Sequence, residues 1–406
     1  MTKLSDYVVE FLVGKGVTDA FVVSGGGIMH LLDSLGAQAR LRYTCNRHEQ
    51  ACAIAAEGYA RTAGRPALCL VTNGPGAVNA LSGIVGAWYD SLPMIVVSGQ
   101  VRRDLIADFR LLRQRGPQEA DLLAMAAPVT KHVASVSEPS EIRRELECAW
   151  HQATAGRPGP VWLELPVDVQ ALDVDPDELE PYRPPAPPAA ADGAALAAQV
   201  RRAAAALRAA ARPLVLCGSG VRLAGATDAL DELLAAAPLP AVVPDSGKDL
   251  VPEDHPRNMG VFGPAGQRRA NFAVQTCDCL LVLGAGLSSK KIGFAFDRFA
   301  PHAYTIAVDV DPDQLAHQVV TPDLAINADL AEFLPLFLDE LRSAPLPPRD
   351  DWLAACRRWK ERYPVMTADH RADTTHVGSY VFMDRLSDEL TGDDVLVTGN
   401  GIDSVS

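Results

Sequence analysis

The chain has 406 residues, more than one hydrophobic core usually organises, so its length predicts two or three domains. A formal net charge of −14 would repel the phosphate backbone of a nucleic acid, and the arginines form no basic stripe, so we expect no nucleic-acid partner. No apolar run approaches the roughly 18 residues of a membrane span, which excludes a membrane protein.

The first predicted element is an amphipathic helix in "MTKLSDYVVEFLVGKG", ending at Gly14 or Gly16. This stretch lacks the basic start, apolar centre and small-residue cleavage site of a secretory signal, so a cytoplasmic location is expected. The eight cysteines fall mostly within helix or strand patterns. We therefore expect buried, reduced thiols rather than disulfides.

Four β-rich runs follow, each leading to glycine or proline: "FVVSGGG" (21–27), "ALCLVTNGPG" (67–76), "MIVVSGQ" (94–100) and "VWLELP" (161–166). Helical patterns separate these runs. Continuous apolar strands that alternate with helices predict a parallel sheet covered on both faces, with ligands at the loops that follow the strands. The sequence thus predicts a first α/β domain over residues 1–172.

A proline-rich stretch, "VDPDELEPYRPPAPPAA", predicts a linker over residues 173–190. The alternation then restarts and predicts a second doubly wound domain over residues 191–343, with strands in "PLVLCGSG", "AVVPDSG", "CLLVLGAG" and "TIAVDVDP". A second linker and helices are expected over residues 344–390. Residues 391–406 are expected to form the first strand and glycine loop of a third domain that is otherwise missing.

The second domain contains weak motifs for cofactors and metals. "GSGVRLAG" (218–225) follows a strand and precedes a helix, but Leu223 replaces the third glycine of a dinucleotide fingerprint. We therefore expect a Rossmann-like turn without a nucleotide, although Asp245 stands where a ribose-binding carboxylate would. Cys277 and Cys279 lack a second cysteine pair, so zinc has little support. No metal ligand is assigned in this sequence.

In "CNRHEQACAIAAEGYAR" (45–61), the acidic residue Glu49 opens a predicted helix whose inward positions are mostly alanine. From the residues alone, two interpretations stay open. In the first, Glu49 forms a capping box with Asn46 as the N-cap. In the second, Glu49 is a functional carboxyl that acts with the glycine-rich loop "TNGPGAVN" (72–79). That loop alone is an ordinary turn signal.

Several ordered motifs, "RHEQACAIAAEGYAR", "VTNGPGAVNALSGIVGAWYDSLPMIVVSGQ" and "GRPGPVWLELPVDVQ" (156–170), closely resemble the thiamine-diphosphate-dependent enzymes of the acetolactate synthase-like family. Residues 260–288 resemble that family's middle domain. The resemblance implies two doubly wound α/β domains, one that binds the cofactor's aminopyrimidine and one that is Rossmann-like. It also implies decarboxylation of a 2-oxo acid, with carboligation to a second carbonyl.

The resemblance also implies roles for individual residues. Glu49 matches the carboxylic acid that hydrogen-bonds the pyrimidine N1′ and stabilises the imino tautomer, whose 4′-imino group deprotonates C2. Gln118 matches a glutamine near the reacting centre, and its neighbour Pro117, where acetolactate synthases commonly have phenylalanine, leaves the acceptor substrate open. The alanines that would exclude water and favour the protonated carboxyl are Ala51, Ala53, Ala55 and Ala56. The expected cofactor contacts are Gly25, Gly26, Thr72, Pro75, Gly76, Asn79 and Gly401.

In this family a third domain holds Mg²⁺ and the diphosphate through a Gly-Asp-Gly motif and later paired asparagines, neither of which occurs here. We therefore expect a fragment or the large subunit of a split enzyme, inactive without a diphosphate-binding domain. Its site would be completed in a homodimer or homotetramer, or by a separate diphosphate-domain subunit. Gly286 stands where flavin-containing members often have arginine, so FAD is not expected.

Two alternatives from other functional classes remain. One is a non-catalytic binding or regulatory subunit that retains the fold, which the absence of the magnesium motif suggests. The other is an NAD-dependent oxidoreductase, which rests only on the weak fingerprint at residues 218–225.

Overall fold

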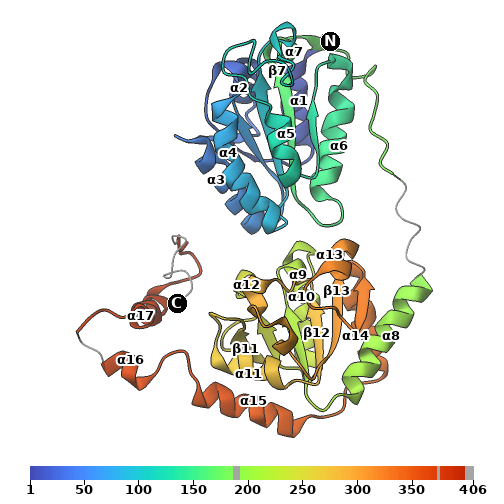
Figure 1. Ribbon diagram of the computed structural model, residues 1–406, viewed down its shortest axis with the longest axis vertical. Coiled ribbons are helices and arrows are strands. Elements are labelled where there is room, and N and C mark those ends of the chain that lie inside the picture. Colours follow the sequence, from blue (N-terminus) through green and yellow to red (C-terminus); the bar gives the residue numbers. More distant parts are fainter. Residues whose placement is uncertain (186–192, 373–374, 398–406) are drawn as a thin grey trace. The chain divides into compact units, whose positions relative to one another are not determined.

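The computed structural model describes residues 1–185, 193–372 and 375–397 (Figure 1). The chain divides into two compact units, Met1–Pro187 and Pro188–Ser406. Each unit contains a six-stranded parallel sheet with helices on both faces, which confirms the predicted fold class of two doubly wound α/β domains. Across the described ranges, we find no helix with the length and apolar character needed to traverse a bilayer.

The first unit has the strand order β3-β2-β4-β5-β7-β6. Its parallel strands are β2 (Asp19–Val22), β3 (Arg42–Cys45), β4 (Ala67–Val71), β5 (Met94–Gln100), β6 (Val133–Ser135) and β7 (Pro160–Pro166). Its α-helices are α1 (Leu4–Gly14), α2 (Met29–Ala37), α3 (Glu49–Ala63), α4 (Pro75–Tyr89), α5 (Leu122–Ala126), α6 (Ile142–Thr154) and α7 (Val167–Gln170).

Helices α1, α2 and α6 cover one face of this sheet, and α3, α4 and α5 cover the other. Burial on both faces explains why the central strands are continuous apolar runs, since every residue of β4 and β7 is buried. One difference from the predicted boundary arises at residues 173–174. They form β8 (Asp173–Val174), which pairs antiparallel with β1 (Thr2–Lys3), so this part of the predicted linker belongs to the first unit.

The second unit has the strand order β11-β10-β9-β12-β13-β14. Its strands are β9 (Pro213–Cys217), β10 (Ala241–Val243), β11 (Asn258–Val261), β12 (Cys279–Leu283), β13 (Tyr304–Asp309) and β14 (Leu324–Asn327). Its helices are α8 (Gly193–Ala209), α9 (Gly220–Leu223), α10 (Thr227–Ala236), α11 (Arg268–Thr276), α12 (Ser289–Ile292), α13 (Pro312–His317), α14 (Leu330–Ser343), α15 (Asp350–Arg362), α16 (Ala368–Ala372) and α17 (Ser379–Glu389).

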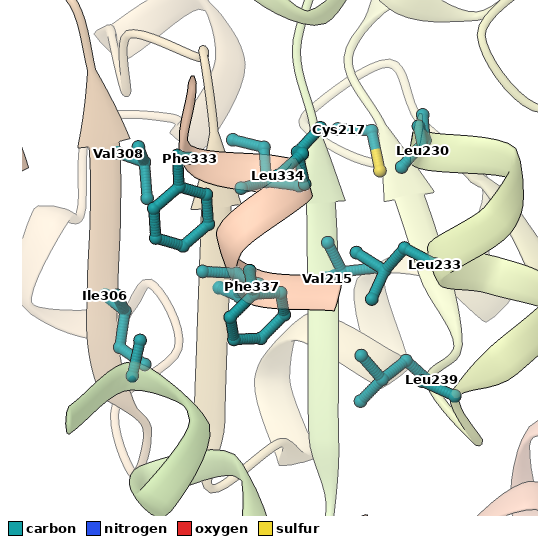
Figure 2. Packing of buried hydrophobic residues seen from close by; sticks show 14 of the residues in the cluster. Val215, Cys217, Leu230, Leu233, Leu239, Ile306, Val308, Phe333, Leu334 and Phe337 are labelled. Carbon is teal, nitrogen blue, oxygen red and sulfur yellow. The ribbon is translucent and has the colours of Figure 1, made fainter. Parts of the chain in front are cut away.

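The core of the second unit is built around two phenylalanines of α14. Phe333 and Phe337 are fully buried and stack with ring centroids 5.3 Å apart. Figure 2 shows the Phe333 ring beside Val308 of β13 and the Phe337 ring beside Val215 of β9. Burying one such aromatic side chain stabilises the fold by roughly 1.5–3 kcal/mol.

The segment after residue 343 differs in part from the prediction. Helix α15 packs on the sheet of the second unit through the buried Trp352, whose indole N–H donates to the Pro213 carbonyl at 2.9 Å. A helix was predicted in this stretch, and its packing adds it to the core of the second unit. Residues 391–397 form no strand, and the rest of the predicted strand, with Gly401, lies outside the described residues.

The cysteine prediction is confirmed, because all eight are free thiols and six of them are buried. Burial raises the pKa of buried thiols such as Cys52 and Cys217 to about 12, which suppresses the reactive thiolate. Cys45 is exposed. We therefore expect Ellman's reagent to label the folded protein in one fast step, and Cys45→Ser to abolish that step. A fast step that survives this substitution would contradict the described burial.

Candidate functional site

The strand order of the first unit reverses between β2 and β4, where the loops after these strands meet. The Gly27 amide donates to Thr72 Oγ1 at 3.2 Å. A Cβ atom at Gly25 would lie 2.4 Å from Thr72 Cβ, and one at Gly27 would lie 2.7 Å from Asn73 Oδ1, so glycine is required at both positions. A Cβ at Gly26 would have no neighbour within 4 Å. This switch point, where α/β sheets bind ligands, therefore has its open side at Gly26.

Glu49 is the first residue of α3, and the residue that caps the helix is His48, whose Nδ1 accepts from the Gln50 amide at 3.2 Å. Asn46 instead accepts a hydrogen bond from the Cys52 thiol through Oδ1, at 3.4 Å. The capping-box interpretation, with Asn46 as the N-cap, is therefore wrong.

Glu49 is only 9% exposed, and its carboxyl is held by the neighbouring helix α4. Its Oε2 accepts from Asn79 Nδ2 at 3.0 Å. Within the described part of the chain, Oε1 has no hydrogen-bond partner. A Cβ at Gly76 would lie 3.0 Å from Oε1, so glycine at this position leaves the oxygen uncovered. The structure thus presents a nearly buried carboxyl with one oxygen fixed and the other accessible to a ligand.

Helices α3 and α4 pack closely, and this packing holds Glu49 of α3 against Asn79 of α4. A Cβ at Gly83 of α4 would lie 2.6 Å from Ala53 Cβ. Ala53 and Ala56 are fully buried, as predicted for a water-excluding helix. Ala51 is exposed and Ala55 is half-buried, so the prediction was wrong for Ala51.

Gln118 is brought to the same loop, although it lies far from it in the sequence. Asn73 Nδ2 donates to the carbonyls of Pro117, at 3.2 Å, and Gln118, at 3.4 Å. A Cβ at Gly74 would lie 1.6 Å from the Gln118 carbonyl oxygen, so the two backbones are in direct contact. Gln118 has a φ of 58°, which is rare for a residue with a side chain. Its side chain is exposed.

The predicted residues Gly25, Thr72, Gly76, Asn79 and Glu49 are thus joined by direct contacts. Pro75 begins α4 beside them.

Sequence reasoning missed three participants. Gly27 and Asn73 make the contacts described above, and Gln170 Nε2 donates to the Gly27 carbonyl at 2.7 Å. Asn73 and Gly27 stand within quoted motifs, and their roles depend on partners distant in sequence. Sequence reasoning also overlooked Glu164, which lies in β7. Its carboxyl is buried in an otherwise apolar strand, and a charged residue in such a run could have marked it for attention.

The Rossmann-like turn of the second unit is closed by backbone contacts. The amides of Gly218 and Gly220 donate to the carbonyls of Leu283, at 2.8 Å, and Gly284, at 3.0 Å. A Cβ at Gly218 would lie 2.3 Å from the Gly284 oxygen. These two amides of the turn are therefore paired with backbone carbonyls of the same unit.

The remaining predicted positions of the second unit serve structural contacts. Asp245 pairs with Lys290 at 2.9 Å. A Cβ at Gly286 would meet the Gln314 side chain at 3.2 Å. Over the residues that the structure describes, no three His, Cys, Asp or Glu side chains are grouped as metal ligands would be.

The fold is that of a doubly wound α/β protein, and the residues in contact at its β2–β4 switch point, Gly25–Gly27, Thr72–Gly76, Glu49 and Asn79, form the candidate site of the first unit. Two family models match the chain: the N-terminal TPP binding domain of thiamine pyrophosphate enzymes over residues 2–125, and the central domain of these enzymes over residues 200–337.

Similar proteins include the probable acetolactate synthase large subunit of Methanocaldococcus jannaschii, which is 34% identical over 374 residues, 91% of this chain and 61% of the relative. The large subunit of acetolactate synthase isozyme 2 of Escherichia coli is 33% identical over 397 residues, 98% of this chain and 68% of the relative. Isozyme 1 from the same organism is 35% identical over 356 residues, 86% of this chain and 59% of the relative.

The chain belongs to the acetolactate synthase-like family of thiamine-pyrophosphate-dependent enzymes. It spans about three fifths of the length of most of these relatives, 61% and 59% in two of the three.

Proposed function

We propose that this chain supplies the pyrimidine-binding side of a thiamine-diphosphate site that decarboxylates a 2-oxo acid and joins the product to a second carbonyl. The observation that carries the proposal is the carboxyl of Glu49, with Oε2 held by Asn79 and Oε1 left uncovered by Gly76. A carboxyl fixed in this way is suited to exchange a proton with one ring nitrogen of a bound heterocycle.

The residues of the candidate site fit the aminopyrimidine of the cofactor. Glu49 Oε1 would hold or release the proton shared with the ring nitrogen, and Asn79 would keep the carboxyl in one orientation. Gly26 and Gly76 would give the ring and the substrate access to the backbone. When bound, the cofactor supplies the carbanion that adds to the keto carbon and stores the electrons released with carbon dioxide.

Gln118 is proposed to contact the substrate, because its exposed side chain stands on the loop that packs against Asn73 and Gly74. We propose that the Mg²⁺ and diphosphate ligands lie outside the described residues. They would come from a further domain or subunit, in a homodimer or homotetramer, or in a complex with a separate subunit. The chain by itself would then be inactive.

Calorimetric titration tests this proposal directly. The protein, in the assembly purified from its native host, is titrated with thiamine diphosphate in the presence of Mg²⁺ and in the presence of a chelator. We expect saturable binding, with one cofactor for each chain and a strong dependence on Mg²⁺. If the intact assembly binds no cofactor under either condition, the chain is instead a binding or regulatory subunit that retains the fold.

A further inference from the structure

The segment that carries Gln118, residues 101–121 between β5 and α5, has little regular structure apart from one short turn, Arg103–Leu105. It also lacks an apolar core of its own, since residues 110–115 are all exposed. Beyond its first residue, the buried positions of the segment are Ala107, Gly116 and Glu119. A hydrophobic core therefore does not explain the order of this segment.

The carboxylate of Glu119 joins these buried positions, because its two oxygens hold two different stretches of the chain. Oε1 accepts from the amide of Ala107 at 2.9 Å. Oε2 accepts from the amides of Arg115 and Gly116, at 2.5 and 2.6 Å. A carboxylate accepts at both oxygens, and hydrogen bonds to a charged acceptor are roughly twice as strong as neutral ones. The Glu119 side chain thus closes residues 107–116 into a loop.

The closed loop leads directly to Gln118. At Gly116 it packs against the sheet, since a Cβ there would lie 2.9 Å from Cγ1 of Val101, the residue that follows β5. Two positions later, the Gln118 carbonyl accepts from Asn73 Nδ2 at 3.4 Å. Gln118 is therefore held from two sides, by the loop that Glu119 closes and by Asn73.

Gln118 needs both restraints because its backbone is strained. Its φ of 58° is rare for a residue with a side chain, and such a conformation persists only where the surroundings over-determine it. Glu119 is the covalent neighbour of Gln118, but the peptide bond between them leaves φ and ψ free. The bonds of the Glu119 side chain reach up to twelve residues back along the chain, so they restrict where the chain enters Gln118.

We propose that Glu119 is a positioning residue, whose bridging carboxylate keeps Gln118 in the left-handed conformation in which it would meet the substrate. The bridge requires both oxygens. A glutamine keeps one acceptor and replaces the other with an NH₂ group, which can only donate and would face an amide N–H. One stretch of the loop is then released, whichever way the amide is oriented. The substrate contact of Gln118 rests on the proposed function, whereas closure of the loop does not.

Amide hydrogen exchange, followed by mass spectrometry at single-residue level, measures this closure without cofactor or substrate. In the wild-type protein, the three amides bonded to Glu119 should exchange about tenfold or more slowly than those of the exposed Arg113 and Gln114, after correction for intrinsic rates. In Glu119→Gln, exchange should accelerate about tenfold at one end of the bridge, at residue 107 or at residues 115 and 116.

The matched control is Asp108→Asn, which alters a second carboxylate of the same loop. Asp108 binds the guanidinium of Arg110 at 2.8 Å and its amide at 3.1 Å, at the surface. The three amides bonded to Glu119 should stay within about twofold of wild type in this variant. Wild-type amides that exchange as fast as Arg113 and Gln114 would overturn the proposal, even if Glu119→Gln fails to fold. So would a folded Glu119→Gln variant in which all three amides stay protected.

A double-mutant cycle in the complete assembly, with pyruvate as the probe 2-oxo acid, tests whether Glu119 acts through Gln118. Glu119→Gln and Gln118→Ala should each lower kcat/KM about tenfold, and the double variant should stay within about twofold of Gln118→Ala. The affinity of Glu119→Gln for thiamine diphosphate should remain at the wild-type level, because the bond between Glu49 and Asn79 is untouched.

Losses that multiply to about a hundredfold in the double variant would show that Glu119 acts independently of Gln118, and would overturn the proposal. If Gln118→Ala alone keeps the wild-type kcat/KM, the substrate contact in the proposed function is rejected, and with it the positioning role. Hydrogen exchange decides separately whether Glu119 closes the loop, so the two failures are distinguishable.

Discussion

Glu49→Gln is expected to lower turnover by about a thousandfold in the complete assembly, within the ~10²–10⁴ range typical of a lost proton-transfer group. A glutamine can still accept from Asn79, but it cannot exchange a proton with the pyrimidine through Oε1. The direct measurement is hydrogen–deuterium exchange at C2 of the bound cofactor, followed by NMR. Exchange should slow by a similar factor, while the melting temperature should change little.

The matched control is Glu57→Gln, which removes a second carboxyl from the same helix. Glu57 lies two turns along α3 from Glu49 and pairs with Arg61 at 2.7 Å. An exposed or partly exposed ion pair of this kind contributes about 0.3–0.5 kcal/mol, so turnover and C2 exchange should remain at the wild-type level. If both variants exchange C2 at the wild-type rate, the role proposed for Glu49 is refuted.

Gly74→Ala is expected to have the largest effect on stability, a loss of about 3 kcal/mol or more. Gly74 has φ 58° and ψ −130°, a conformation that residues with side chains avoid. An added Cβ would also lie 1.6 Å from the Gln118 carbonyl oxygen, so the two loops must separate. By calorimetry the first unit should melt about 6–12 °C lower, since 1 kcal/mol corresponds to ~2–4 °C in a domain of this size.

Gly58→Ala provides the comparison for this substitution. Gly58 lies in the interior of α3, and a Cβ added there would have no neighbour within 4 Å. Alanine should therefore stabilise the helix by roughly 0.5–1 kcal/mol. A Gly74→Ala variant that melts as high as Gly58→Ala would show that the loops do not meet as described.

The sequence predicted the central strands because strands buried on both faces are continuous apolar runs, as in "ALCLV" of β4. The short edge strands gave no such signal. Strand β14 alternates buried and exposed residues over only four positions, and the three residues of β6 are all half-buried. From sequence alone, a run of three or four residues cannot be distinguished from a loop, because only its pairing with the neighbouring strand identifies it as a strand.

Residues of the site were predictable where a motif marked them, as for Glu49, Gly76 and Asn79. Their mutual contacts were not, because they depend on how α3 and α4 pack. The cap of α3 illustrates the limit. Asparagine is the commoner N-cap, but here the Gln50 amide donates to the imidazole of His48. Glu164 was overlooked because its partner, Gln100, comes from a strand that is distant in sequence and adjacent in the sheet.

The contact between Gly83 and Ala53 limits how the candidate site can vary. Because a hydrogen on one helix faces a methyl group on the other, the spacing of α3 and α4 is at its lower limit. Any bulkier residue at position 83 would act as a wedge about a turn from Asn79, stretching its 3.0 Å bond to Glu49. The orientation of the Glu49 carboxyl is thereby set by a position that does not touch it, and substitutions at Gly83 would impair the chemistry while leaving every residue of the candidate site unchanged.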